Sequence, residues 1–235
     1  LSSQDSEVSN ETGEAVTFEV STDMLYRAAQ LDGVSDAPQG IMSLWFRSDY
    51  SSTEFSQFIT VDGSLNGFGL PVFNDNLGIF TNHSAANKGW AGFVQNTLSN
   101  KFEWHDPDGL PSARRFDGLW HHIWMSWDTD FPVGSRLGNL VIDGVEITTA
   151  NNNDIGSAFD VDWTLPGICI IGQGFSGTTP IVRFTTDVAE LYLNTSEYLS
   201  PIPANVSKFR DPSTGKPVPL GSDGSLPTGN PPSIY

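Results

Sequence analysis

The sequence predicts an all-β protein, an antiparallel β-sandwich, from two main observations. Short segments of alternating or continuous apolar residues recur along the chain, and turn residues separate them, as in sandwiches. No segment has a long helical period, and 23 glycines and 15 prolines are typical of many tight loops. The 235 residues can bury a core without disulfides, since 38% are hydrophobic and 11% aromatic.

Each expected strand rests on its own pattern. Val16–Val20 alternates with period two, as a half-buried strand does, whereas Ile168–Gly172 is apolar on both faces, as a central strand would be. Asp143-Gly144 is the turn of a hairpin, and a short helical turn is expected at Pro203–Phe209. In chain order we expect strands at Val16–Val20, Ile41–Arg47, Phe55–Val61, Phe68–Phe73, Leu77–Thr81, Trp90–Gln95, Trp120–Asp128, Asn139–Ile142, Val145–Ile147, Ile168–Gly172 and Asp187–Leu193.

The sandwich is expected to occupy Ala15–Lys208, with a different kind of segment at each end. Leu1–Glu14 is polar and acidic and reads as an arm, and Phe209–Tyr235 is rich in Pro, Gly and Ser and reads as an extended tail. Both offer little apolar surface, and ordering a backbone costs about 1–2 kcal/mol per residue. We therefore expect both segments to be mobile in the isolated protein and to become ordered against neighbouring subunits.

The charge excludes some partners. With 11 basic and 28 acidic residues the net charge is −17, which repels nucleic acid and anionic lipid. No apolar stretch approaches the length of a membrane span, so membrane insertion is not expected. The single cysteine, Cys169, lies in an apolar run and is expected to be a small buried residue.

Two longer segments resemble a known family. Asp117–Asp128, which contains Trp120-His121-His122, and then Gly138–Val145 resemble the signature of concanavalin A-like laminin-G and pentraxin domains. Val188–Leu193, followed by Lys208–Asp211 and Thr214–Gly229, resembles the closing region of laminin-G-like proteins in tailed-phage structural modules. The resemblance implies a concanavalin A-like jelly roll and a virion context. It implies no defined ligand.

The strand pattern also sets expectations for the motif's own side chains. In Trp120–Asp128, alternation places Trp120, Trp124 and Ser126 on one face, and we expect the two tryptophans to be buried near Ile142. His121 and His122 point to opposite faces and cannot easily share a metal, so one is expected in the core and the other on the outer face.

Catalytic patterns are weak in this sequence. Glycoside hydrolases of this fold carry Glu-x-Asp-x-Glu on one strand face, and the nearest match, Asp160-Val161-Asp162, lacks the glutamates. A Gly-x-Ser-x-Gly elbow is missing. A lyase that uses Tyr, His and Arg stays open. We expect no catalytic residues and no enzyme.

Two kinds of binding site are considered. Calcium needs hard oxygen ligands on a turn, and Asn151, Asn153 and Asp154 are the candidates, although Asn and Asp also make ordinary turns. No other cofactor is expected. A sugar would stack on an exposed aromatic ring beside acidic residues. Trp90 and Trp104 are the candidates, with Asp106 and Asp108 beside the second, although packing in the fold is the favoured role for the two rings.

Three functions follow. The first is a non-enzymatic phage virion protein, a surface decoration, fibre or tail-associated module that contacts other virion subunits as a homo-oligomer and also contacts the host surface. The alternative is a carbohydrate-binding module for a host or environmental glycan. The third is a polysaccharide lyase or hydrolase.

Overall fold

The structure, a computed structural model, describes residues 15–18, 25–27, 33–47, 56–61, 76–84, 87–97, 100–105, 118–132, 137–147, 150–154, 158–161, 163, 168–171, 175–176, 179–180 and 186–234. The polar arm Leu1–Glu14 and the expected strand Phe68–Phe73 lie outside these residues. Within them the regular elements are all β-strands except one short helix, α1 (Pro203–Val206), where the sequence predicts a helical turn.

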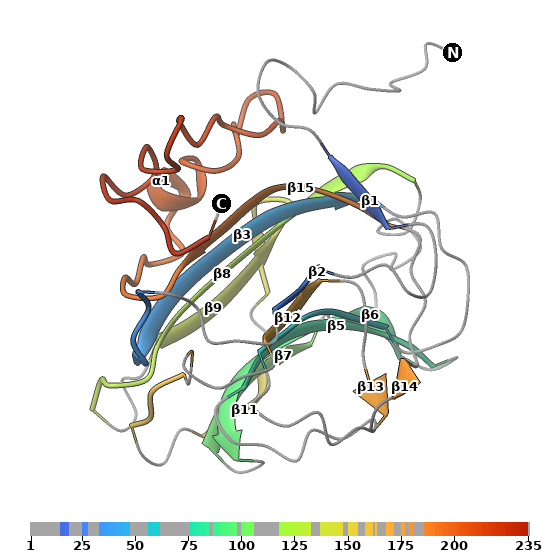
Figure 1. Ribbon diagram of the computed structural model, residues 1–235, viewed down its shortest axis with the longest axis vertical. Coiled ribbons are helices and arrows are strands. Elements are labelled where there is room, and N and C mark those ends of the chain that lie inside the picture. Colours follow the sequence, from blue (N-terminus) through green and yellow to red (C-terminus); the bar gives the residue numbers. More distant parts are fainter. Residues whose placement is uncertain are drawn as a thin grey trace.

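Two antiparallel sheets face each other and form the sandwich (Figure 1). The first sheet has six strands, in the spatial order β1 (Val16–Phe18), β15 (Thr186–Asn194), β3 (Gln39–Arg47), β8 (Trp120–Asp128), β9 (Leu137–Ile142) and β10 (Val145–Glu146). The second has seven, in the order β11 (Ala150–Asp154), β7 (Asn100–His105), β6 (Asn87–Thr97), β5 (Asn76–Ser84), β4 (Ser56–Val61), β12 (Ile168–Ile171) and β2 (Leu25–Arg27). A small hairpin joins β13 (Phe175–Ser176) to β14 (Thr179–Pro180).

Strand β8 is central to the first sheet and is buried on both faces. It pairs with β3 along its whole length and with β9 on the other side, and all but its first residue are buried. One face of the sheet, which carries Ile123, Met125 and Trp127, turns toward the second sheet. Gly40 of β3 lies directly under the Trp127 indole. Only glycine fits there, since a Cβ at position 40 would collide with the ring.

The opposite, outer face of the first sheet is covered by the chain's own C-terminal segment, residues 195–234 (Figure 1). Phe209 and Leu220 are 1% and 6% exposed and pack with Trp124 of β8. Other members of this cluster are Ile41, Val141, Tyr192 and Val206, with Leu199 packed against it.

This packing corrects the expectation that Phe209–Tyr235 has little to bury within its own chain. Phe209 meets Tyr192 edge-on, with ring centroids 5.0 Å apart. Close to its end, Ile234 forms a backbone bridge with Leu193 of β15. Burial of aromatic and aliphatic side chains on the sheet, together with these backbone hydrogen bonds, offsets the entropy cost of ordering the segment. A neighbouring subunit is therefore not needed to order it.

The expectations for the Trp-His-His motif are confirmed in part. Trp124 is fully buried, whereas Trp120 is half-buried at the end of the strand. The cross-strand neighbour of Trp124 is Val141, and Ile142 pairs with Ile123 on the other face, one position away from the expectation. No helix among the described residues is both long and apolar enough to cross a bilayer.

Candidate binding site on the first sheet

The outer face of the first sheet changes character along β3 and β8. The register pairs Ser43 with Trp124, Trp45 with His122 and Arg47 with Trp120, so these six residues share one face. At Trp124 the face is apolar and covered. Toward Arg47 and Trp120 it becomes polar and partly accessible to solvent. We call this part the polar end of the first sheet.

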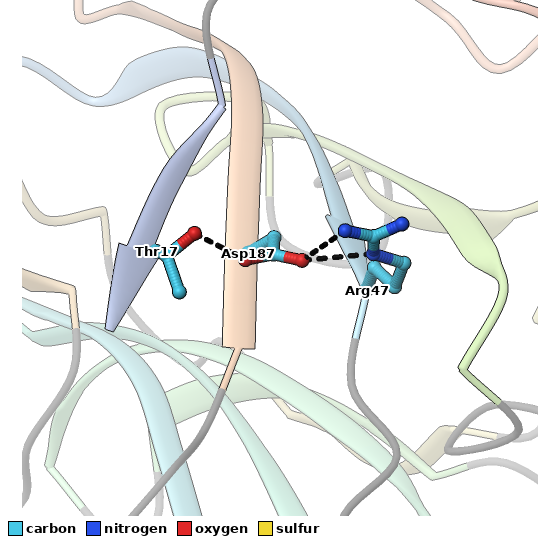
Figure 2. Close-up of polar contacts among 3 residues, drawn as sticks. All are labelled: Thr17, Arg47 and Asp187. Carbon is cyan, nitrogen blue, oxygen red and sulfur yellow. Dashed lines mark hydrogen bonds and ion pairs between the residues drawn. The ribbon is translucent and has the colours of Figure 1, made fainter. Parts of the chain in front are cut away.

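A charged network joins three strands at this end (Figure 2). The Asp187 carboxylate accepts a 2.8 Å hydrogen bond from Arg47 Nε and lies 2.6 Å from Arg47 Nη2. Thr17 Oγ1 donates to the other carboxylate oxygen over 2.6 Å. The guanidinium also stands over the Trp120 ring, 5.1 Å from its centroid, in a cation–π contact. The Arg47 side chain is 38% exposed, so the network reaches solvent.

His122, the next residue of β8 after Trp120 on the same face, is buried and uncharged. Its Nε2 lies 2.9 Å from Ser43 Oγ, and its ring stacks on Trp45 at a centroid distance of 5.0 Å. Burial lowers the pKa of His122 from 6.5 to about 3, and the Arg210 charge adds to this effect, while the Asp143 charge opposes it. Because Ser43 and His122 are 2% and 0% exposed, this Ser–His pair cannot meet a substrate from solvent.

The Asp143-Gly144 turn anchors both histidines. Both residues have positive φ, 53° and 82°, as a type I′ hairpin requires. His121 Nδ1–H donates to Asp143 Oδ2 over 2.8 Å, and the His122 backbone N–H donates to Oδ1 over 2.9 Å. Burial pushes the pKa of Asp143 upward, but these hydrogen bonds and the charges of His121 and Arg210 outweigh it and hold the pKa below its usual value.

Both histidines of the motif are buried. His122 lies on the outer face, at 0% exposure, whereas His121 turns to the inner face, at 8% exposure, and stacks on Phe46. The expected opposition of the two side chains is confirmed. His122 is buried although it lies on the outer face, and its ring contacts Ser43 and Trp45.

Arg210 extends the polar end from the C-terminal segment. It forms a backbone bridge with Pro217, and its guanidinium lies between two glycines of positive φ. A Cβ added to Gly144 would be 3.3 Å from Nη1, and one added to Gly215 would be 3.0 Å from Nη2. Larger residues would therefore crowd this guanidinium. Its charge acts on both Asp143 and His122.

These side chains can bind a polar ligand. Trp120 offers a half-buried indole, Arg47 and Arg210 are donors, and Asp143 and Asp187 are acceptors. An aromatic ring beside such groups suits stacking and hydrogen bonding of a polyhydroxylated molecule. In the part of the chain that the structure describes, no group of three His, Cys, Asp or Glu residues could hold a metal.

The residues predicted as a sugar site lie elsewhere, in the second sheet. Trp90 is in β6 and Trp104 in β7, where Trp104 pairs with Gly92 of β6. Asp106 and Asp108 lie outside the described residues, and ligand binding at these four residues stays a prediction.

The residues predicted to bind calcium on a turn form a strand instead. Asn151, Asn153 and Asp154 belong to β11, an edge strand that pairs with β7. The register shifts between Ala150 and Asn152, so Asn151 occupies a bulge. A run of Asn and Asp resembles a turn in sequence, but here the neighbouring strand supplies its backbone partners. Calcium binding stays a prediction.

Sequence reasoning missed the polar end as a site. The sequence indicates Asp143 only as a turn residue, and it predicts that the closing segment, which contains Arg210, is extended. One feature of the sequence could have indicated the site, namely charged residues at the ends of apolar or motif segments. Arg47 ends the strand Ile41–Arg47, Asp187 begins the strand Asp187–Leu193, and Arg210 lies in the motif Lys208–Asp211. Nothing in their spacing shows that the fold brings them to one end of one sheet.

Comparison with known proteins supports the fold. The sialidase carbohydrate-binding module CBM40 of Ruminococcus gnavus, bound to α2,6-sialyllactose, is 14% identical, with a TM-score of 0.51 over 80% of this chain and 94% of that one. The same module bound to α2,3-sialyllactose is 12% identical, with a TM-score of 0.51 over 81% and 94%.

Domains LG4-5 of the mouse laminin α1 chain are 15% identical, with a TM-score of 0.49 over 80% of this chain and 43% of that one. No protein-family model matches the sequence, and no curated protein matches it. The chain is therefore an antiparallel β-sandwich of the jelly-roll type, with structural neighbours that are binding domains.

Proposed function

We propose that this chain is a non-catalytic carbohydrate-binding module that contacts a glycan through the polar end of the first sheet. The observation that carries the proposal is the half-buried indole of Trp120, placed beside Arg47 and Asp187 on an outer sheet face. Aromatic rings flanked by hydrogen-bonding side chains suit the apolar faces and hydroxyl groups of sugars.

The structural neighbours support the same class. The R. gnavus CBM40 module, which shares this fold, binds sialyllactose. At such low identity the likeness concerns the fold, and the ligand of this chain depends on its own residues. The Ser43–His122 pair gives no support to a hydrolase, since both side chains are buried.

A glycan array tests the proposal. The wild-type chain is expected to bind one or more glycans. Trp120→Ala is expected to bind them about tenfold more weakly, because a stacking surface is lost. Phe131→Ala is the control, since Phe131 is an aromatic residue that is 41% exposed beyond the other end of β8. Equal binding by both variants, or no binding by the wild type, would reject the proposal.

A virion role is the second candidate. Its support is the resemblance of the closing segment to phage structural modules, together with two exposed apolar side chains on that segment, Ile202 at 51% and Leu226 at 69%. Contacts between subunits would cover such residues. Imaging of intact particles of the virus that encodes this chain is the test. Particles without density for this fold would exclude the role.

A further inference from the structure

The Arg210 guanidinium is a cation that the described part of the protein does not fully satisfy. Its Nε is buried and has no hydrogen-bond partner there. Buried donors in folded proteins are nearly always paired, and one left unpaired is costly. The Arg210 residue as a whole is only half-buried, so a molecule from solvent can approach its remaining donors.

Asp143 offers the complementary acceptor. Each of its carboxylate oxygens accepts one hydrogen bond, from His121 and from the His122 backbone. A carboxylate has about four lone-pair positions, so each oxygen can accept another hydrogen bond. The Asp143 side chain is 36% exposed, which leaves it open to a ligand hydroxyl group.

The two groups are held at a fixed relative position. Gly144 follows Asp143 in the turn, and a Cβ added to it would be 3.3 Å from Nη1 of Arg210. A Cβ added to Gly215 would be 3.0 Å from Nη2, so both backbone segments lie close to the guanidinium. A preorganised donor and acceptor lose little entropy when they bind.

The charge around this pair decides which ligand it fits. A carboxylate sugar would gain from Arg210 but would meet Asp143 and a protein of net charge −17. Two neighbouring hydroxyl groups meet no such repulsion, since one can donate and the other can accept.

We propose that Asp143 and Arg210 bind a vicinal pair of hydroxyl groups on a neutral sugar. One hydroxyl group donates to Asp143, and the oxygen of the next accepts from Arg210. This inference rests on the proposed carbohydrate-binding function and deepens it by naming the ligand class. It also identifies Arg210 and Asp143 as the residues that distinguish neutral from acidic sugars.

Titration calorimetry with lactose and with α2,6-sialyllactose tests the inference on the full chain. Lactose is the neutral probe, and sialyllactose adds one carboxylate to it. Wild-type protein is expected to bind lactose at least as tightly as sialyllactose. Arg210→Gln is expected to weaken lactose binding about tenfold, because a hydrogen bond from a charged donor is lost.

Two further variants sharpen the result. Lys216→Gln removes a positive charge from an exposed residue of the same segment and is expected to leave lactose binding unchanged. Asp143→Asn keeps a residue that tolerates positive φ but removes the charge, and is expected to weaken binding. If Arg210→Gln fails to fold, lactose-induced shifts of the Gly144 and Gly215 amide resonances in the wild-type protein provide the same test.

The outcomes separate the two proposals. Glycan binding on the array that survives Arg210→Gln would overturn this inference and leave the proposed function standing. Tighter binding of sialyllactose than of lactose would do the same. A wild-type chain that binds no sugar in either experiment would overturn both.

Discussion

His122 is an imidazole that the fold keeps uncharged on the outer face of the first sheet. It touches Ser43 and Trp45, and its Nδ1 has no partner among the described residues. Nearby, the Asp143 carboxylate is held in its charged form by hydrogen bonds. His122 and Asp143 are therefore close neighbours, since the backbone N–H of His122 donates to the Asp143 carboxylate. The fold lowers the pKa of both groups and so opposes the protonation of each.

The pKa directions set how stability depends on pH. The folded-state pKa of His122 is about 3, below its ordinary value of 6.5, so the unfolded chain binds more protons between these values. Stability is therefore expected to fall as pH decreases from 6.5 toward 3, with a slope of up to about 1.4 kcal/mol per pH unit. The lowered pKa of Asp143 adds a loss in the same direction below pH 3.8.

Urea denaturation at several pH values measures this slope. His122→Gln is expected to reduce it by about one proton between pH 6.5 and 4, since glutamine does not titrate. Ser43→Ala removes the partner of His122 but keeps the imidazole, so this control should retain the slope. A His122→Gln variant with the wild-type pH dependence would contradict the buried, neutral state.

At the scale of elements, the strands with a clear pattern were predictable and the polar ones were not. Trp120–Asp128 is strand β8 with the bounds that alternation predicts, and Asp143-Gly144 is the expected turn. Strands β7 and β11 carry Asn, Lys, Glu and Asp, so their formation depends on a neighbouring ladder that no local pattern reveals.

The C-terminal segment is the larger failure of prediction. Its buried residues, Val206, Phe209 and Leu220, are single apolar positions among turn residues, so they form no periodic run. Their partners, Trp124 and Tyr192, come from distant strands. The polar end was missed for the same reason, since Arg210 comes close to Gly144 only once the segment lies on the sheet.

Packing of this segment predicts its contribution to stability. Phe209→Ala is expected to lower the free energy of unfolding by about 3–5 kcal/mol, because a buried ring on Trp124 and Tyr192 is removed. Leu226→Ala is the control, since that side chain is 69% exposed and a change there should cost less than about 0.5 kcal/mol. Equal unfolding midpoints in urea for both variants would show that the segment is not packed on the sheet.

At the scale of the whole molecule, the C-terminal segment adds a third layer to the sandwich. The first sheet is then buried on both faces around Trp124 and Trp127, while its polar end stays accessible beside Arg47. The same segment carries Arg210 to this end. Stability of the fold and assembly of the candidate site therefore depend on one segment, and loss of that segment would affect both.

The net charge of −17 makes a final prediction for the molecule as a whole. Like charges across one surface repel, and this repulsion is stronger in the compact folded state than in the expanded unfolded chain. Salt shortens the screening length to about 8 Å at 0.15 M, so NaCl is expected to raise the melting temperature. The partly exposed Arg47–Asp187 pair weakens in salt, but surface pairs contribute only about 0–1 kcal/mol. A variant with Asp130→Lys, Glu146→Lys and Asp160→Lys, all at exposed positions, carries less negative charge and should gain less from salt. Scanning calorimetry across NaCl concentrations measures both effects, and a wild-type melting temperature that falls with added NaCl would show that specific ion pairs, and not general repulsion, dominate the electrostatics of this fold.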